Sequence, residues 1–290
     1  ELLLDTDSEE KAIERIKDKD IVIADMFICP LNKNVLGAAD NLKLLALNTT
    51  AFEKVDLDVA KEKGIKISNI ADYSIDSVAE LTFSLMLAVS RRVVVGDRDF
   101  RKKPFQTLPD VEEHHKKYKG FNLRGKTLGV IGVGNIGSRV CEIGKAFGMN
   151  VIGYNRSEKQ LGGVTFKSFD EVISESDFIS LNVSVNEESK GIIGSEQFSK
   201  MKESAIIVST TGGEVIDTSA LYTALKERKI FGAGLDVVSL GENKEILELD
   251  NVVFSPQVGW FTNESLDNLG RMIVDNVESF VKGEAKNIVN

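Results

Sequence analysis

Three glycines near the middle of the chain have the spacing of a phosphate-binding turn. Gly132, Gly134 and Gly137 form the pattern G-x-G-x-x-G, with Asn135 and Ile136 before the last glycine. In such a turn the first glycine permits a tight bend, the second lets a pyrophosphate approach the backbone, and the third lets the following helix pack closely on the strand. Free N–H groups and the positive dipole at the helix start then favour bound phosphates. The spacing therefore indicates binding of a dinucleotide.

The neighbouring residues supply the strand–helix–strand unit that such a turn requires. Thr127–Ile131 is a short apolar run, as expected for a buried parallel strand, and a helix can follow Gly137. A second strand ends at Asn155, at the expected distance. Because glycines cluster in many turns, a turn with a purely structural role is the alternative. The complete strand–helix–strand context favours dinucleotide binding.

The end of the second strand bears on which dinucleotide is bound. An acidic residue at this place would bind the ribose 2′-hydroxyl of NAD, but the chain has Asn155 followed by Arg156 and Ser157. A carboxylate would repel a 2′-phosphate, whereas amide, guanidinium and hydroxyl groups can bind one. We therefore expect NADP(H) to be preferred over NAD(H). The alternative is that Arg156 is an ordinary surface arginine.

The rest of the chain alternates strands and helices. Before the turn, the pattern predicts strands at Leu2–Leu4, Ile21–Ala24, Leu44–Leu47 and Ile65–Ile67, and helices at Glu9–Lys17 and Asp56–Lys63. After it, the pattern predicts strands at Asp177–Val183, Ala205–Ser209, Gly232–Val238 and Val252–Ser255, and helices at Ser195–Met201, Thr218–Lys229 (capped by Asp217) and Asn263–Lys282. This alternation predicts an α/β protein with a doubly wound parallel sheet and a second, smaller α/β layer.

A long helix and an exposed connector are expected before the turn. Ser77–Ser90 is nearly all apolar, and Ser77 with Glu80 matches a capping box. A helix that is apolar on every side must be buried, so we expect it between domains or at a subunit interface. The connector, residues 99–125, holds the only histidines of the chain, His114 and His115. Adjacent histidines in a charged run are usually solvated, and no metal site is expected.

Bulk properties restrict the class of protein. A chain of 290 residues is long enough for two domains, and a net charge of −9 argues against nucleic acid or an anionic membrane as the main partner. No apolar run approaches the roughly 18 residues that span a bilayer, and Glu1–Asp5 reads as a strand rather than a signal peptide. Cys29 and Cys141 form no C-x-x-C pattern, which favours a reducing, cytoplasmic setting. The expected partner is a small-molecule substrate.

Several segments together give the chain a specific resemblance to the D-2-hydroxyacid dehydrogenase family, which includes phosphoglycerate dehydrogenase and glyoxylate/hydroxypyruvate reductase. The resemblance covers nearly the whole length, through Gly64–Asn69, Ser77–Glu80, Gly125–Gly137, Phe198–Lys202, Val215–Asp217 and Gly232–Val237. It implies a flavodoxin-like substrate domain from residues 1–92 and 263–290, a Rossmann-type domain at 93–262, and a cleft between them for cofactor and substrate. It also implies a homodimer through the Ser77–Ser90 helix and the arm that follows.

The resemblance further implies which residues line the cofactor. Asp236 matches the family's aspartate that contacts the nicotinamide carboxamide, with a loop cap as the alternative role. Ser209 and Thr210 lie where the backbone passes the nicotinamide ribose. The other residues that the resemblance assigns to the cofactor are Val183, Thr211, Gln257 and Gly259.

The three catalytic side chains of the family are missing from their expected positions. In the family an arginine binds the substrate carboxylate, a histidine donates a proton, and a glutamate raises the pKa of that histidine. The arginine position is Gly212 and the histidine position is Gln257. The glutamate position is Gly241, unless a one-residue slip in this short loop brings in Glu242. The substrate-carboxylate loop, Asn48–Glu53, departs from the family as well.

Gln257 and Glu242 thus remain the catalytic candidates. Gln257 can donate a hydrogen bond to a carbonyl group, but it cannot transfer a proton near neutral pH. Acid–base help is worth roughly 10²–10⁴ in rate, so ordinary 2-hydroxyacid turnover should be poor. Two functions follow: an NAD(P)-dependent oxidoreductase that acts on a CH–OH/C=O group through an altered site, or an inactive NAD(P)-binding protein that serves as a sensor or assembly partner.

Overall fold

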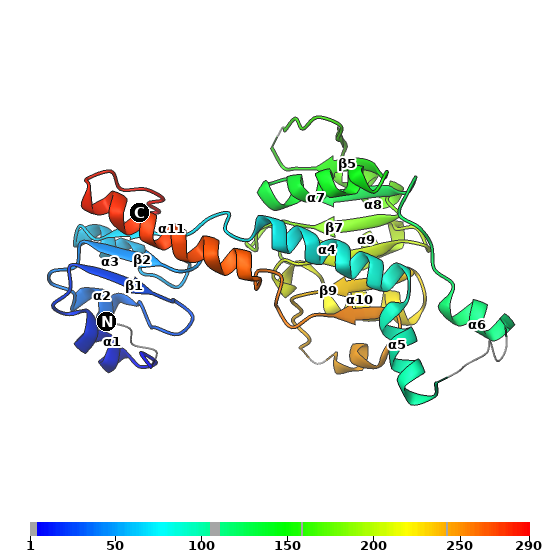
Figure 1. The fold of residues 1–290 in the computed structure, drawn as a ribbon, viewed down its shortest axis with the longest axis horizontal. Helices are drawn as coiled ribbons and strands as arrows, with labels where there is room; N and C mark the ends of the chain where they lie inside the picture. The colour runs from blue at the N-terminus through cyan, green and yellow to red at the C-terminus, as the bar shows by residue number, and fades with distance from the viewer. Residues whose placement is uncertain (1–4, 105–110, 158, 242) are drawn as a thin grey trace. The chain divides into compact units, whose positions relative to one another are not determined.

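The computed structural model describes residues 5–104, 111–157, 159–241 and 243–290, and for residues 111–114 it describes the backbone alone. Contacts divide the chain into two compact units. Unit 1 combines Glu1–Tyr73 with Thr262–Asn290, and unit 2 is Ser74–Phe261 (Figure 1). The C-terminal segment therefore belongs with the first part of the chain.

Within the described residues, unit 2 is built on a seven-stranded parallel sheet. In chain order the strands are β4 (Thr127–Ile131), β5 (Asn150–Tyr154), β6 (Thr165–Phe166), β7 (Phe178–Leu181), β8 (Ile206–Ser209), β9 (Gly232–Leu235) and β10 (Val252–Phe254). In space the order is β10-β9-β8-β7-β4-β5-β6. The chain winds outward from β4 through β5 on one side and through β7 on the other, so these strands form a topological switch point, where ligands of such sheets bind. The expected doubly wound sheet is confirmed.

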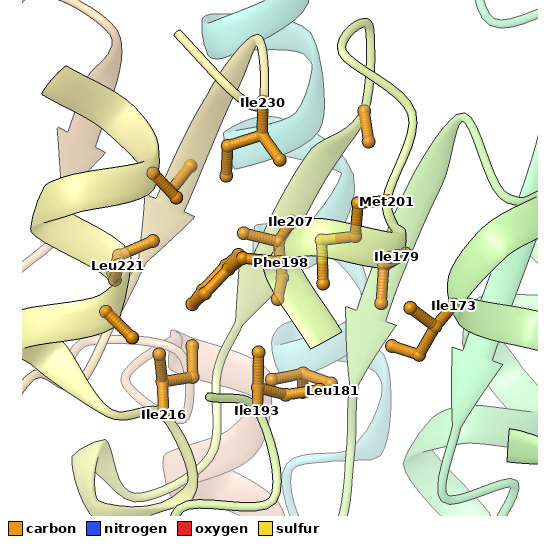
Figure 2. Packing of buried hydrophobic residues seen from close by; sticks show 14 of the residues in the cluster. Ile173, Ile179, Leu181, Ile193, Phe198, Met201, Ile207, Ile216, Leu221 and Ile230 are labelled. Atoms are coloured by element: carbon orange, nitrogen blue, oxygen red, sulfur yellow. The ribbon is translucent and has the colours of Figure 1, made fainter. Parts of the chain in front are cut away.

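Helices cover both faces of this sheet, because its strands are apolar on both sides. On one face lie α4 (Ile75–Ser90) and α7 (Asn135–Ala146), which pack together as Figure 1 shows. The other face carries α8 (Phe169–Glu175), α9 (Ser195–Lys200) and α10 (Thr218–Lys226). Figure 2 shows the hydrophobic core on the face that carries α8, α9 and α10, in which Phe198 of α9 lies beside Ile207 of β8.

Helix α4 packs closely on β9 because that strand has glycine where the helix approaches. A β-carbon added at Gly234 would lie only 2.8 Å from Leu85 Cβ. Buried residues such as Phe83 and Met86 bind α4 to the same core as β8. The observed division after Tyr73 therefore differs from the expected one near residue 92, because α4 belongs to unit 2.

The start of α4 also differs from the expectation. The helix begins at Ile75, with Ser74 as the preceding residue, so the capping box expected from Ser77 and Glu80 is wrong. Ser77 instead donates from Oγ to the backbone oxygen of Ser74 at 3.0 Å, and Glu80 is exposed. Both residues therefore lie within the first two turns of the helix rather than at its start.

The residues after α4 form helices where an exposed connector was expected. These are α5 (Val93–Lys102) and α6 (Val111–Tyr118). Helix α5 ends shortly before Pro104, since proline disfavours helical backbone in the residue before it. His115 is exposed, as expected, whereas the side chain of His114 lies outside the described part of the chain.

Asp250 joins two arginines within unit 2. Its Oδ2 accepts from Nη2 of Arg92 at 3.0 Å, and its Oδ1 accepts from Nη2 of Arg228 at 2.7 Å. Burial alone would raise the pKa of Asp250, but the hydrogen bond and charge of Arg228 and the charge of Arg92 leave it below its usual value. The Arg92 side chain is only 9% exposed, so the carboxylate of Asp250 compensates a largely buried positive charge.

We expect Asp250→Asn to lower the free energy of unfolding by about 2 kcal/mol at neutral pH, because Arg92 loses its counter-charge. Since the folded-state pKa is depressed, this stabilisation is complete above the unfolded-state pKa of about 4 and is lost as the pH falls through the folded-state value. Urea unfolding at several pH values should show the two proteins converging in acid. The control is Glu227→Gln, which breaks an exposed pair with Lys229 and should cost less than about 0.5 kcal/mol. Equal effects of both variants would contradict this role for Asp250.

Unit 1 is a smaller α/β layer. Its strands β1 (Ile21–Ala24), β2 (Leu44–Leu47) and β3 (Lys66–Ser68) pair in parallel in that order. Its helices are α1 (Glu9–Ile16), α2 (Lys33–Gly37), α3 (Leu57–Glu62) and α11 (Asn263–Val281). Helix α11 packs on β2, and the backbone N–H of Val289 donates to Ile67 O at 2.9 Å. The strand expected at Leu2–Leu4 lies outside the described residues.

Most expected elements occur with shifted ends. Asp217 caps α10 as expected, since its Oδ1 accepts from the backbone N–H of Ser219 at 2.9 Å and of Ala220 at 3.0 Å. Elements that were not expected are α2, α5, α6, α8, β6 and the short 3-10 helices η1 (Gly213–Val215) and η2 (Lys244–Glu248). None of the described helices is both long enough and apolar enough to cross a membrane.

Candidate cofactor site and active site

The glycine-rich turn joins β4 to α7 at the switch point of the unit 2 sheet. Gly132 has a left-handed backbone, with φ of +88°, and a β-carbon there would lie 2.7 Å from Asn182 O. A β-carbon at Gly137 would lie 2.1 Å from Gly132 O, so the helix could not approach the turn so closely with any other residue. Gly134, which precedes the first residue of α7, has open space where a β-carbon would stand. The turn therefore has the bend, the close helix and the open approach that a pyrophosphate needs. Asn135 is exposed beside this space and Ile136 is half-buried.

Buried polar atoms lie at the ends of β7 and β8, the two strands that follow β4 on one side of the sheet. Asn182 follows β7 and Ser209 ends β8; among the described residues, Asn182 Oδ1 and the Ser209 hydroxyl are buried without a hydrogen-bond partner. Ser209 is only 1% exposed. Leaving buried polar atoms unsatisfied costs about 1–3 kcal/mol each, so a ligand or water at this edge would stabilise them. These residues fit a nicotinamide dinucleotide that runs along the carboxyl ends of the strands.

The loops after β7 and β8 are tied together at this edge. Thr211 donates from Oγ1 to the backbone oxygen of Val183 at 2.6 Å. Val183 and Thr210 are half-buried in the same two loops. The residues that the sequence assigned to the nicotinamide half of the cofactor therefore lie on adjacent strand ends.

The residues after β5 are arranged differently from the expectation. Asn155 uses its side-chain amide within the protein: Oδ1 accepts from Val133 N at 2.6 Å, and Nδ2 donates to Val133 O at 3.3 Å. Arg156 forms an ion pair with Glu188, and Ser157 is exposed. Asn155 thus braces the glycine-rich turn.

Lys159 is a further residue of this region that sequence reasoning missed. Its Nζ donates to Val133 O at 2.5 Å, which places an ammonium group on the glycine-rich turn. The signal that could have indicated it is its position four residues after Asn155, in the same segment as Arg156.

Asp236, which follows β9, is a buried loop cap. It is 5% exposed, and its carboxylate accepts from Ser255 Oγ at 2.5 Å and from the backbone N–H groups of Val258 and Gly259, both at 3.0 Å. These bonds hold the loop that follows β10 and carries Gln257. The alternative role considered from the sequence, a loop cap, is therefore present in the structure.

We expect Asp236→Asn to lower the free energy of unfolding by about 2 kcal/mol, because an amide cannot accept all of these bonds and a buried donor loses its partner. Urea unfolding measures the change. Asp217→Asn is the control: asparagine caps helices as well as aspartate does, so the loss should stay below about 0.5 kcal/mol. Equal losses would show that Asp236 holds its loop no more firmly than an ordinary cap.

Gln257 lies on the loop that Asp236 holds. Its backbone has a φ of +56°, an uncommon value outside glycine, and its N–H donates to Asp236 O at 2.9 Å. The side chain is exposed, as are those of Val258 and Phe261. Gln257 therefore presents an amide, which can donate a hydrogen bond but carries no titratable proton.

Comparison with known proteins identifies the family. A profile described as D-isomer specific 2-hydroxyacid dehydrogenase, NAD binding domain, matches residues 83–259. This chain belongs to that family. It is similar to the glyoxylate reductase of Thermococcus litoralis, with 35% identity over 96% of this chain and 86% of that protein.

Solved structures of D-2-hydroxyacid dehydrogenases and related enzymes agree with this assignment. An acyclic imino acid reductase in complex with NADPH and D-Arg is 33% identical, with a TM-score of 0.86 over 98% of this chain and 89% of that one. The D-lactate dehydrogenase of Aquifex aeolicus, complexed with NAD and lactic acid, is 34% identical, with a TM-score of 0.80 over 96% and 88%. The expected family and fold are confirmed, and the domain is one that binds a nicotinamide cofactor.

Gly212 is the position at which the sequence predicts the arginine of D-2-hydroxyacid dehydrogenases. A β-carbon there would lie 2.5 Å from Cγ2 of Val185, which belongs to the loop after β7. Gly241, the predicted position of the family's glutamate, has a φ of +51° and open space around it. Glu242 lies outside the described residues. Val185 thus occupies the space into which an arginine at 212 would have to extend.

The segment Asn48–Glu53 of unit 1, where the family's substrate-carboxylate loop is expected, is held by hydrogen bonds of its threonines. Thr49 donates from Oγ1 to Ala51 O at 2.7 Å, and Thr50 donates from Oγ1 to Ile70 O at 2.8 Å. Within the described residues no group of three or more His, Cys, Asp or Glu side chains could hold a metal ion.

Proposed function

We propose that this chain is an NADP(H)-dependent oxidoreductase of the D-2-hydroxyacid dehydrogenase type, which transfers a hydride to or from a CH–OH/C=O group through an altered active site. The observation that carries this proposal is the glycine-rich turn, with open space at Gly134 and an amide, Asn155, where a carboxylate would bind the ribose of NAD. Arg156, Ser157 and Lys159 follow in the same segment and can contact a 2′-phosphate. No carboxylate among Asn155–Ser157 repels that phosphate.

Each part of the site has a physical role in this proposal. The turn at Gly134 and the start of α7 hold the pyrophosphate with backbone N–H groups, while Asn182 and Ser209 supply polar atoms at the strand ends. The bound nicotinamide supplies or accepts the hydride. Gln257 donates a hydrogen bond to the substrate carbonyl and orients it. Because the amide of Gln257 cannot give up a proton, water provides the proton that the carbonyl oxygen takes up during reduction.

The substrate differs from an ordinary 2-hydroxyacid in this proposal. With Gly212 in place of the arginine, unit 2 has no bidentate carboxylate clamp at this position. The substrate therefore carries no α-carboxylate, or another cation binds it.

Dissociation constants for NADPH and NADH, measured by fluorescence titration, test the cofactor assignment. We expect NADPH to bind more tightly, and tighter binding of NADH would contradict it. Oxidation of NADPH in the presence of a panel of 2-oxoacids and aldehydes tests the activity. We expect slow turnover of glyoxylate and hydroxypyruvate, whereas rapid turnover would show that the altered positions are not limiting.

A second candidate function is an inactive dinucleotide-binding protein that acts as a sensor or assembly partner. The absence of a titratable group at Gln257 favours it. The same panel separates the two functions, since this candidate requires tight NADPH binding and no oxidation with any compound.

We also propose that the protein is a cytoplasmic homodimer, assembled through α4 and the arm that follows it. Val93, Val94 and Phe100 of α5 are exposed apolar residues on that arm. Cys29 and Cys141 are free, and burial raises the pKa of the Cys141 thiol to about 12, which suits a reducing compartment. Sedimentation equilibrium tests the dimer, and a monomer at micromolar concentration would contradict it.

A further inference from the structure

An ion pair joins two loops that follow the strands on either side of β4. Arg156 follows β5, and its partner Glu188 lies in the segment after β7. In the sheet β4 lies between β5 and β7, and the glycine-rich turn follows β4. The pair therefore connects the loops after the two strands that flank β4. Both side chains are well exposed, 78% for Arg156 and 71% for Glu188. An exposed pair of this kind is weak, so an approaching anion can compete for the arginine.

Glu188 is held in place by a well-bonded turn. The side chain of Asn186 accepts from the backbone N–H groups of Glu188 and Ser189, both at 3.0 Å. Ser189, which is buried, donates from Oγ to Ser184 O at 2.8 Å. The backbone that carries Glu188 is therefore held by a bonded turn, while its exposed carboxylate pairs with Arg156.

Lys159 supplies a second positive charge on the same turn. It is half-buried, its Nζ donates to Val133 O, and it has no carboxylate within 4.0 Å among the described residues. Asn155 donates to the same backbone oxygen, so the Lys159 ammonium group lies close to Asn155. In dinucleotide-binding sheets the residue at the position of Asn155 contacts the adenosine ribose. A phosphate on that ribose would give Lys159 an anionic partner, which none of the described residues provides within 4.0 Å.

We propose that Lys159 and Glu188 together set the discrimination between NADP(H) and NAD(H), a proposal that rests on the proposed function. Lys159 attracts the 2′-phosphate, and Glu188 opposes it by holding Arg156 and by repelling the phosphate charge. Binding of NADP(H) transfers Arg156 from Glu188 to the phosphate. The preference for NADP(H) over NAD(H) is thus set by three side chains from two loops. Lys159 and Arg156 favour NADP(H), and Glu188 opposes it.

Titration of NADPH and NADH against matched variants tests the proposal. Lys159→Met should weaken NADPH binding about tenfold and change NADH binding less than about twofold. Lys145→Met is its control, because Lys145 also donates to a backbone oxygen, that of Gly162 at 2.8 Å, but lies in the last turn of α7. Glu188→Gln should strengthen NADPH binding about fivefold, whereas Glu187→Gln, one residue away and without the arginine pair, should not.

The outcomes separate this proposal from the cofactor assignment. If the wild type binds NADH more tightly but the variants shift the NADPH-to-NADH ratio as stated, the cofactor assignment fails and the proposal stands. If the wild type prefers NADPH but Lys159→Met and Glu188→Gln leave the ratio unchanged, the proposal is overturned and the assignment stands. Circular dichroism of each variant confirms that the fold is retained, and a shift in NADH binding equal to that of NADPH also overturns the proposal.

Discussion

Replacing Gly134 by valine is expected to abolish binding of the nicotinamide cofactor while the protein stays folded. The position has open space for a side chain and an ordinary negative φ of −82°, so valine fits the protein alone. The added methyl groups would occupy the place through which a pyrophosphate reaches the N–H groups at the start of α7. Losing these charge-assisted hydrogen bonds should raise the dissociation constant of NADPH about 100-fold or more.

Gly194→Val is the matched control for this variant. Gly194 also precedes a helix of unit 2 and has an extended backbone, but it stands before α9 rather than α7. A β-carbon there would meet no atom closer than 3.6 Å. Both substitutions should cost about 1 kcal/mol or less of stability in urea unfolding. Only Gly134→Val should lose NADPH in a fluorescence titration. Retained NADPH affinity in a folded Gly134→Val protein would show that the cofactor does not use this turn.

The glycine-rich turn could be predicted from sequence because its constraints are local. Gly132, Gly134 and Gly137 lie within six residues, and each role follows from the strand before and the helix after. The doubly wound sheet was predictable for a similar reason, since buried parallel strands read as short apolar runs. The structure adds the distances that make two of these glycines obligatory and leave the third open.

Features that depend on residues distant in the chain could not be predicted. The amide of Asn155 is turned toward Val133, and Arg156 is paired with Glu188, a residue of another loop. The division after Tyr73 depends on how tightly α4 packs on β9, which no local pattern shows. Residues 99–125 were predicted to be an exposed connector because the charged run near Pro104 is typical of one. The residues before Pro104 instead form the helix α5.

Gly212 and Gln257, the positions at which the family's arginine and histidine are predicted, differ in how readily they would accept those side chains. At Gly212, Cγ2 of Val185 from the neighbouring loop lies 2.5 Å from the place where a β-carbon would stand. Restoring the arginine alone should therefore force Val185 aside. Gln257 is different, because its backbone conformation suits histidine, which tolerates positive φ better than most residues.

These contacts predict how activity can be restored. We expect the triple variant Val185→Ala, Gly212→Arg, Gln257→His to reduce glyoxylate with NADPH about 100-fold faster than the wild type, because it regains a carboxylate clamp and a proton donor. Gly212→Arg with Gln257→His but with Val185 retained should gain much less, since the arginine is displaced. NADPH oxidation at saturating cofactor measures both.

The pH dependence shows whether the new histidine acts as the acid. Reduction requires the protonated imidazole, so the rate of the triple variant should fall as the pH rises through about 6.5, whereas the wild type should show no such step. A matched protein with Gln257→Asn in place of Gln257→His keeps an amide and also tolerates the backbone. It should show neither the gain in rate nor the pH step. A gain without the step would assign the activity to substrate binding alone, and no gain in a folded triple variant that binds NADPH would mean that the site has been reshaped for a different substrate.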